Sequence, residues 1–271
     1  MRISIITVFF VATSLSSLAQ DTLGYNWVSV GELEIDSSSY WTLDGLNNNL
    51  TVSNNVISKI DSLGVVKFTQ SIKSLGNESE IFPINAMKIM HFSEAQQTLC
   101  FFDNTLTQVD DCIDLVDLDI INATLIATSS RPDMIWIFDN VNSSLALTSM
   151  VGDFVKQETI NINGILAIDS VIQMIESNGR LYLLDARKGV YVFDLLGSLI
   201  EYIEMPNVRS IDVSNESIFA IRDSELLVRT MGENEIVSIA PPTKEIKELK
   251  FRNGIFYFRT EKNVHKYQLQ F

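Results

Sequence analysis

Carboxylates on short apolar runs are the residues of this sequence that could do chemistry. Four such side chains, Asp44, Glu176, Asp212 and Glu248, lie in or beside strand-like segments far apart along the chain. Two carboxylates that meet can act as general acid and general base, or can share a cation. They form a site only if the fold brings their strands to one place. We therefore ask which elements could do so.

A second set of candidates consists of polar residues that recur at the fourth position after the start of an apolar burst. If these turns share one end of the fold, their side chains could surround a ligand. Asn and Asp side chains also form hydrogen bonds with their own backbone in turns, and we expect turn formation to explain most of these recurring polar residues. The candidates are Asn54, Asp103, Asp139, Asp185, Arg222 and Arg259, with Arg187 and Lys188 beside Asp185.

Aromatic and metal-binding residues add little. Trp27, Trp41 and Trp136 could stack on a sugar; Trp136 lies inside IWIF and is predicted to be core, whereas Trp41 could line a central channel. His91 and His265 are the only histidines, and we expect structural roles for both. The sequence has no zinc-binding spacing, nucleophile elbow or phosphate loop, so we expect no metal, no cofactor and no catalytic residue.

The densest acidic stretch is VDDCIDLVDLD. Its carboxylates could attract Ca²⁺, but the spacing of an EF-hand loop is not met. We expect an edge strand or loop protected by charge.

Short apolar bursts recur along the chain, separated by Asn, Asp, Ser and Gly, and helical periodicity is nearly absent. Successive bursts are roughly 36 to 49 residues apart, close to the period of propeller blades. Each burst belongs to a unit of strand, strand, turn, strand, strand. The unit predicts an all-β propeller of six four-stranded blades, with seven blades as the alternative and a long loop over 71–86. The bursts start at Leu50, Leu99, Ile135, Leu181, Ile218 and Ile255.

The hairpin LYLLDARKGVYVFDLLG explains why stacked blades are favoured. Leu181 and Leu183 point to one face of a strand and Tyr182 and Leu184 to the other, and all four are apolar. A sandwich leaves one face of each strand wet, whereas stacked blades bury both. The last repeat has three strands, so we expect the strand at 27–35 to complete it and close the ring.

The blade segments NGRLYLLDARKGVYVFDLLGSLIEYIEM and PDMIWIFDNVNSSLALTSM resemble blades of secreted NHL-like propellers. Together with FFDNTLTQVDD, they make the chain similar to a family of secreted bacterial six-bladed β-propellers. The resemblance implies a fold and an export route, and it carries no catalytic residue. WD40 and kelch signatures are absent from the sequence.

The first residues predict export. Arg2 precedes a mostly apolar run over 3–12, and Ser17-Leu18-Ala19 matches a cleavage site, so 1–19 is predicted to be a signal peptide and 20–271 a single propeller domain. We expect a periplasmic or extracellular protein with no membrane span. The net charge of −14 disfavours binding to nucleic acid.

The two cysteines, Cys100 and Cys112, leave two alternatives. A disulfide is allowed in an exported protein. A tight hairpin at Asp103-Asn104 would, however, place Cys100 opposite Thr107, so we expect two unbridged thiols packed in the fold.

These observations favour an exported, non-catalytic propeller that binds another envelope protein or a small ligand. The alternative is a carbohydrate-active or lactonase-like hydrolase with acidic residues or a cation in the channel, by analogy with known propellers. The lining of the central channel would decide between them: clustered acids favour the enzyme.

Overall fold

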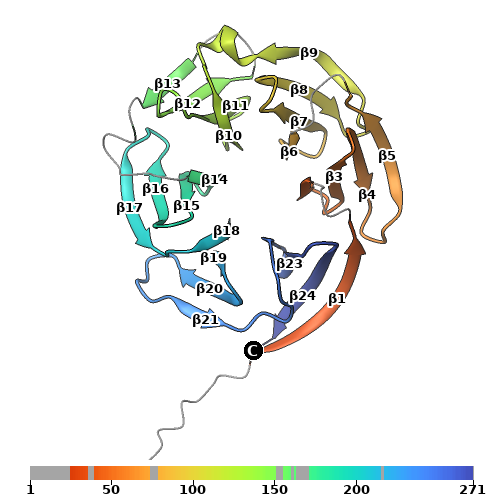
Figure 1. The fold of residues 1–271 in the computed structure, drawn as a ribbon, viewed down its shortest axis with the longest axis vertical. Helices are drawn as coiled ribbons and strands as arrows, with labels where there is room; N and C mark the ends of the chain where they lie inside the picture. Colours follow the sequence, from red (N-terminus) through yellow and green to blue (C-terminus); the bar gives the residue numbers. More distant parts are fainter. Residues whose placement is uncertain are drawn as a thin grey trace, which may run out of the picture.

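The computed structural model shows six four-stranded antiparallel sheets arranged as blades around a central axis (Figure 1). The structure describes residues 25–35, 40–73, 79–150, 155–159, 162, 171–214 and 217–270. The predicted all-β fold, a six-bladed β-propeller, is confirmed.

In blades 1 to 5 the four strands follow one another from the axis outward. Blade 1 contains β2 (Tyr40–Leu43), β3 (Asn49–Ser53), β4 (Val56–Ile60) and β5 (Val66–Ser71). Blade 2 contains β6 (Ser79–Pro83), β7 (Lys88–Ser93), β8 (Thr98–Asp103) and β9 (Gln108–Asp114). Blade 3 contains β10 (Ala123–Thr128), β11 (Met134–Asp139), β12 (Ser144–Ser149) and β13 (Val155–Thr159).

The second half of the ring repeats this order. Blade 4 contains β14 (Val171–Ser177), β15 (Arg180–Asp185), β16 (Gly189–Asp194) and β17 (Leu199–Glu204). Blade 5 contains β18 (Val208–Val213), β19 (Ser217–Arg222), β20 (Glu225–Thr230) and β21 (Val237–Ile239). Blade 6 contains β22 (Glu248–Arg252), β23 (Ile255–Arg259), β24 (Asn263–Gln270) and, as its outer strand, β1 (Asn26–Glu34).

The ring is closed by strands from the two ends of the domain. β1 pairs antiparallel with β24, and Asn26 lies opposite Gln270 (Figure 1). The predicted closure by an N-terminal strand is therefore confirmed. It leaves no long unpaired edge between the first and last blades.

Six apolar clusters form the core, one at each contact between neighbouring blades. The strand β15 is apolar on both faces because it contacts a neighbouring blade on each side. Leu181 and Leu183 pack in the cluster shared with blade 3, whereas Tyr182 and Leu184 pack in the cluster shared with blade 5. The alternation predicted from the sequence is thus the alternation of two blade contacts.

Blade 2 corrects the prediction of a long loop. The segment expected to be loop, 71–86, contains the innermost strand β6, and the run starting at Met87 forms the second strand rather than the first. β6 is short and ends in Pro83, whose ring cannot donate to a sheet. Only one of its five side chains, Ile81, is fully buried, so its apolar signal is weak.

The two cysteines form a disulfide, with their Cα atoms 4.3 Å apart. The expectation of unbridged thiols was wrong for two reasons: the turn runs from Asp103 to Thr107 instead of closing at Asp103-Asn104, and the β8–β9 pairing beyond it is irregular. The pairing shifts between Leu99 and Phe101, and Asp110 adopts a left-handed backbone conformation with φ of 65°. The longer turn and this bulge together bring Cys112 beside Cys100.

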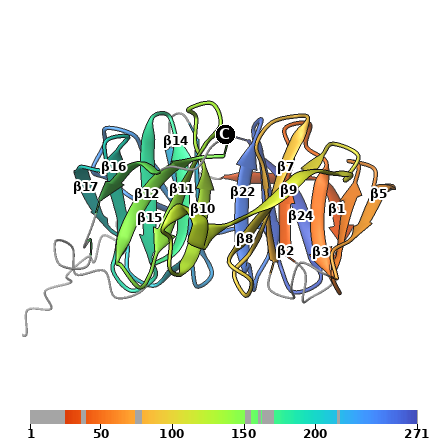
Figure 2. The same cartoon turned by 90° about the horizontal axis from the view of Figure 1, so that it is seen from above.

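Seen from the side, the strands run between two end faces (Figure 2). We call them the Tyr40 face, where the innermost strands begin, and the Asp44 face, where those strands end. The turns between second and third strands lie on the Tyr40 face, because neighbouring strands are antiparallel. Within the described part of the chain, no helix has the length and apolar character needed to cross a membrane.

Candidate functional site

The innermost strands of all six blades surround a central channel with a volume of about 580 Å³. Polar side chains join these strands across the blade boundaries. Gln173 on β14 exchanges two hydrogen bonds with the backbone of Ile211 on β18, at 2.9 and 2.8 Å. The Ser210 hydroxyl accepts a 3.2 Å hydrogen bond from the backbone N–H of Leu249 on β22. The channel wall is therefore held by side chains as well as by blade packing.

All four carboxylates singled out in the sequence line this channel: Asp44, Glu176, Asp212 and Glu248. They do not converge. Glu248 begins its strand and lies toward the Tyr40 face, whereas Asp44, Glu176 and Asp212 lie at or near the ends of their strands, toward the Asp44 face. The channel thus has acids at both ends.

Asp44 is buried and bonded to the protein around it. Lys59 lies 2.9 Å from its Oδ2, and the backbone N–H groups of Leu46 and Asn48 each donate to its Oδ1 at 2.8 Å. Burial alone would raise the pKa of Asp44, but hydrogen bonds from the Asn48 and Lys59 side chains and from this backbone lower it overall. This carboxylate is ionised and structural.

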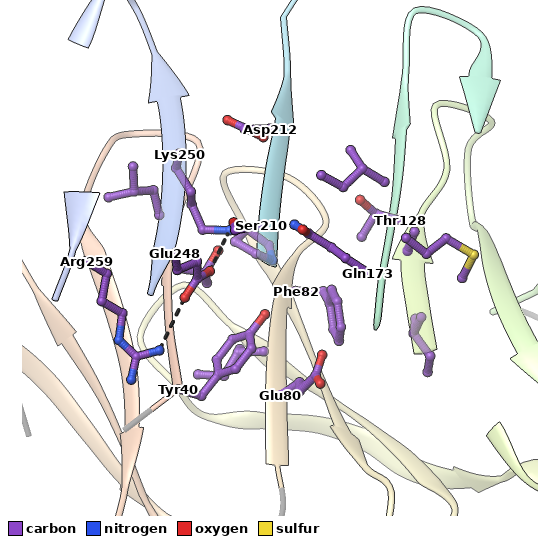
Figure 3. Close-up of a pocket in the computed structure, with 18 of the residues that line it drawn as sticks. Tyr40, Glu80, Phe82, Thr128, Gln173, Ser210, Asp212, Glu248, Lys250 and Arg259 are labelled. Carbon is purple, nitrogen blue, oxygen red and sulfur yellow. Dashed lines mark hydrogen bonds and ion pairs between the residues drawn. The ribbon is translucent and has the colours of Figure 1, made fainter. Parts of the chain in front are cut away.

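Asp212 and Glu248 are also paired. Asp212 Oδ2 accepts hydrogen bonds from the backbone N–H of Phe251 at 2.6 Å and from the Arg252 guanidinium at 2.7 Å. Glu248 lies 3.4 Å from the Lys250 ammonium and 3.2 Å from the Arg259 guanidinium (Figure 3). Both carboxylates therefore carry their counter-ions within the channel wall.

A fifth channel carboxyl was missed in the sequence because its strand was taken for a loop. Glu80 on β6 lies near Tyr40 and Phe82 at the Tyr40 end (Figure 3). Burial, followed by repulsion from Glu248, raises the pKa of Glu80 to about 7. The apolar pair Ile81-Phe82, together with the long interval before Leu99, was the available signal.

The polar residues predicted to occupy equivalent turns do not all lie on the same face of the propeller. Asp139 and Asp185 are fully buried at the ends of β11 and β15, and their side chains accept backbone N–H groups of the following turns. Asp103 ends a third strand rather than a second one, so it lies on the opposite face from the others. The prediction that Asp103 shares a face with the other turn residues was wrong because it assigned the burst at Leu99 to the second strand of blade 2, whereas this burst is the third strand.

The basic candidates have separate surroundings. Arg222 pairs with Glu225 at 2.9 Å on the rim, whereas Arg259 reaches the channel and pairs with Glu248. Arg187 is exposed and Lys188 is half-buried in the β15–β16 turn. The structure therefore does not gather these side chains into one ring.

The tryptophans contribute to the core. Trp41, expected to be able to line the channel, is fully buried, and its indole N–H donates to Asn49 at 3.1 Å. Trp136 is fully buried as predicted. Trp27 makes an edge contact with Phe256, with ring centroids 5.2 Å apart.

The acidic stretch and the histidines lie away from the channel lining. Asp110 and Asp111 are exposed on the edge strand β9, in agreement with the predicted edge position. His91 is buried, and His265 lies 3.6 Å from Glu32. The described residues contain no group of three His, Cys, Asp or Glu side chains suited to holding a metal ion.

Comparisons with known proteins agree on the fold. No protein-family model and no curated protein matches the sequence. A virginiamycin B lyase from Staphylococcus aureus matches at 13% identity, with 91% of this chain and 100% of that chain covered and a TM-score of 0.62. The Pan2 WD40 domain of Neurospora crassa matches at 6% identity, with 89% and 94% covered and a TM-score of 0.60. BamB from Moraxella catarrhalis matches at 10% identity, with 83% of each chain covered and a TM-score of 0.53. At these identities, what the chain shares with all three is the β-propeller fold.

Proposed function

We propose that the protein is an exported β-propeller that binds a small ligand in its central channel and does no chemistry on it. One observation carries the proposal: the channel is open, at about 580 Å³, while four of its five described carboxylates are already bonded to protein groups. That volume falls within the usual range of ligand sites, about 300–1,000 Å³. Because one similar structure is a lyase, the fold alone would also be compatible with catalysis.

The channel is favoured over a protein-binding rim. Of the rim candidates, Asp139 and Asp185 are used to form turns, and Arg222 is paired with Glu225. The negative charge of the chain also opposes nucleic acid as a partner. If the protein instead bound an envelope protein on an end face, alanine replacement of exposed Arg187 should abolish that binding.

A channel-filling variant tests the site. Ile172 lines the channel and is 41% exposed, so Ile172→Trp narrows the cavity without removing a polar partner. Val66→Trp is the matched control, because Val66 is 55% exposed on the outer strand β5. We expect some member of a panel of anionic, neutral and cationic small molecules to raise the Tm of the wild type and of Val66→Trp but not of Ile172→Trp. A panel with no stabilising member, or equal stabilisation of all three proteins, would overturn the proposal.

Export is proposed on separate grounds. The segment 1–19 has the charge, apolar run and cleavage pattern of a signal peptide, and the Cys100–Cys112 disulfide is compatible with an oxidising compartment. The motif LYLLDARKGVYVFDLLG supports a relationship to secreted NHL-like propellers of bacteria. Expression in a bacterial host should give a periplasmic or extracellular protein whose intact mass is that of a chain starting at Gln20. An uncleaved chain retained in the cytoplasm would contradict export.

A hydrolase is the second candidate, and one observation favours it. Glu80 has a raised pKa while nearby Glu248 is held beside two cations, and carboxyls with contrasting environments are typical of acid–base pairs. Catalysis would be supported if the wild type hydrolyses aryl glycosides or lactones and if the rate falls about 100-fold or more in both Glu80→Gln and Glu248→Gln. No turnover of either substrate class leaves the binding function in place.

A further inference from the structure

The Tyr40 end of the channel contains two polar groups that the described protein does not satisfy. No described residue forms a hydrogen bond with the Glu80 carboxyl or the Tyr40 hydroxyl, whereas the other channel acids have several partners. Both side chains line the channel and are only partly enclosed. Both groups face the channel and remain available to form hydrogen bonds with a ligand that enters it.

The charges around Glu80 determine what kind of ligand fits. Burial has the largest effect on the pKa of Glu80, followed by repulsion from Glu248 and then from Glu94, and all three raise it. The Lys250 ammonium lowers this pKa, but its effect is smaller than that of either carboxylate. At the Glu80 carboxyl the two carboxylates therefore outweigh Lys250, which favours a cation over an anion.

Carboxylates also affect the neighbouring Tyr40 phenol. After burial, the carboxylates of Glu80 and Glu248 raise the pKa of the Tyr40 phenol, and the opposing effect of Arg259 is smaller. At the Tyr40 hydroxyl these two carboxylates therefore outweigh Arg259. A ligand with positive charge gains there from both carboxylates.

The neighbouring rings favour an organic cation. Tyr40 and Phe82 have ring centroids 6.5 Å apart, with their planes tilted by 49°, and both line the channel beside Glu80 (Figure 3). Aromatic faces attract ammonium groups and also pack against alkyl chains. A hard metal ion instead requires several oxygen ligands, and the described residues offer no such cluster.

We propose that Glu80, Tyr40 and Phe82 form a binding site for a protonated organic amine, with the Glu80 carboxylate as its counter-ion. This assignment rests on the proposed channel-binding function and specifies its ligand class. On binding, the amine N–H donates to the carboxylate, and any proton on Glu80 passes to solvent. The phenol of Tyr40 and the ring of Phe82 contact the body of the ligand.

The test uses two probes of nearly equal shape, benzylammonium and benzyl alcohol, in NMR titrations of the intact domain. Benzylammonium should bind more tightly than the alcohol. Its apparent Kd should be about tenfold weaker at pH 6 than at pH 8, because the carboxylate is ionised in about a tenth of molecules at pH 6 and about nine tenths at pH 8. Benzylammonium itself stays protonated over this range.

Three variants locate the effect. Glu80→Gln should weaken benzylammonium binding at least about tenfold at pH 8 and remove its pH dependence. Phe82→Leu should weaken it about threefold. Glu235→Gln, the same change at an exposed position on another blade, should leave it unchanged.

Several outcomes would overturn the amine site. They are no binding of benzylammonium, equal affinity for the alcohol, equal affinity of Glu80→Gln, and displacement by an equimolar amount of Ca²⁺. If a neutral or anionic compound binds in an Ile172-dependent way while benzylammonium does not, the channel function stands and the amine assignment fails.

Discussion

The indole Nε1 of Trp136 donates a 2.6 Å hydrogen bond to Glu176, joining blade 3 to blade 4 at the channel wall. The same carboxylate accepts hydrogen bonds from the Ser129 hydroxyl and the Ser130 backbone N–H, each at 2.7 Å. Burial alone would raise the pKa of Glu176, but hydrogen bonds from Ser130, Ser129 and Trp136 lower it overall. An acid that could have been catalytic is therefore used to hold two blades together.

We expect Glu176→Ala to lower the free energy of unfolding by about 2–4 kcal/mol, because it leaves the Trp136 and Ser130 donors without an acceptor. Glu176→Gln should cost less, since one oxygen remains to accept. Urea unfolding at pH 7 measures both, with Glu235→Gln as the exposed control. Because the folded pKa is lowered, the contribution of Glu176 is present above its unfolded pKa and is lost as pH falls through its folded pKa. Equal stability of Glu176→Ala and wild type would show that the carboxylate does not join the blades.

Glu80 should have the opposite effect on stability. Its pKa rises from 4.5 to about 7 on folding, so the folded protein favours the neutral acid, and stability falls as pH rises between these values. The full cost above pH 7 is about 3 kcal/mol. Glu80→Gln should therefore be more stable than wild type at pH 8.5 and nearly equal to it at pH 4. Denaturant midpoints at the two pH values check this, and a constant difference between them would contradict the raised pKa.

The closed ring of blades could be predicted from the sequence because many residues in each repeat follow the same pattern. Strands such as β15 are apolar on both faces, which only stacked blades explain, and in five of the six blades the burst is the second strand. Asp44, Glu176, Asp212 and Glu248 were found for the same reason: each lies on or beside an innermost strand of the repeat. The partners of Glu176 and Asp212 could not be found, because those contacts join neighbouring blades whose residues are 40 and 39 positions apart in sequence.

The remaining errors come from local departures from the repeat. β6 has five residues and a terminal proline, so its weak apolar signal hid both the strand and Glu80. The misplacement of Asp103 followed from the same omission. The disulfide depends on the turn over 103–107 and on a bulge that includes Asp110, and such local insertions leave no periodic trace in a sequence.

His91 should make the protein sensitive to acid. It is fully buried, neither ring nitrogen has a partner among the described residues, and burial lowers its pKa from 6.5 to about 4. The folded state therefore favours neutral histidine, and stability is lost as pH falls below 6.5. Relative to His91→Leu, the wild type should lose about 2.5 kcal/mol between pH 7.5 and 4.5. His265→Gln serves as control, and a parallel decline of wild type and His91→Leu would refute the assignment.

The Cys100–Cys112 disulfide should stabilise the blade 2 hairpin. It closes a loop with a sequence separation of 12, for which the entropy lost by the unfolded chain corresponds to about 3 kcal/mol. The double variant Cys100→Ala/Cys112→Ala should lose about that amount in denaturant unfolding, and reductant should destabilise the wild type but not the variant. Because Cys100 is fully buried while Cys112 is partly exposed, reduction should require opening of the hairpin and proceed slowly. Intact-mass analysis after thiol alkylation follows its progress. Two alkylated thiols in the protein as purified from an oxidising compartment would show that the bond does not form.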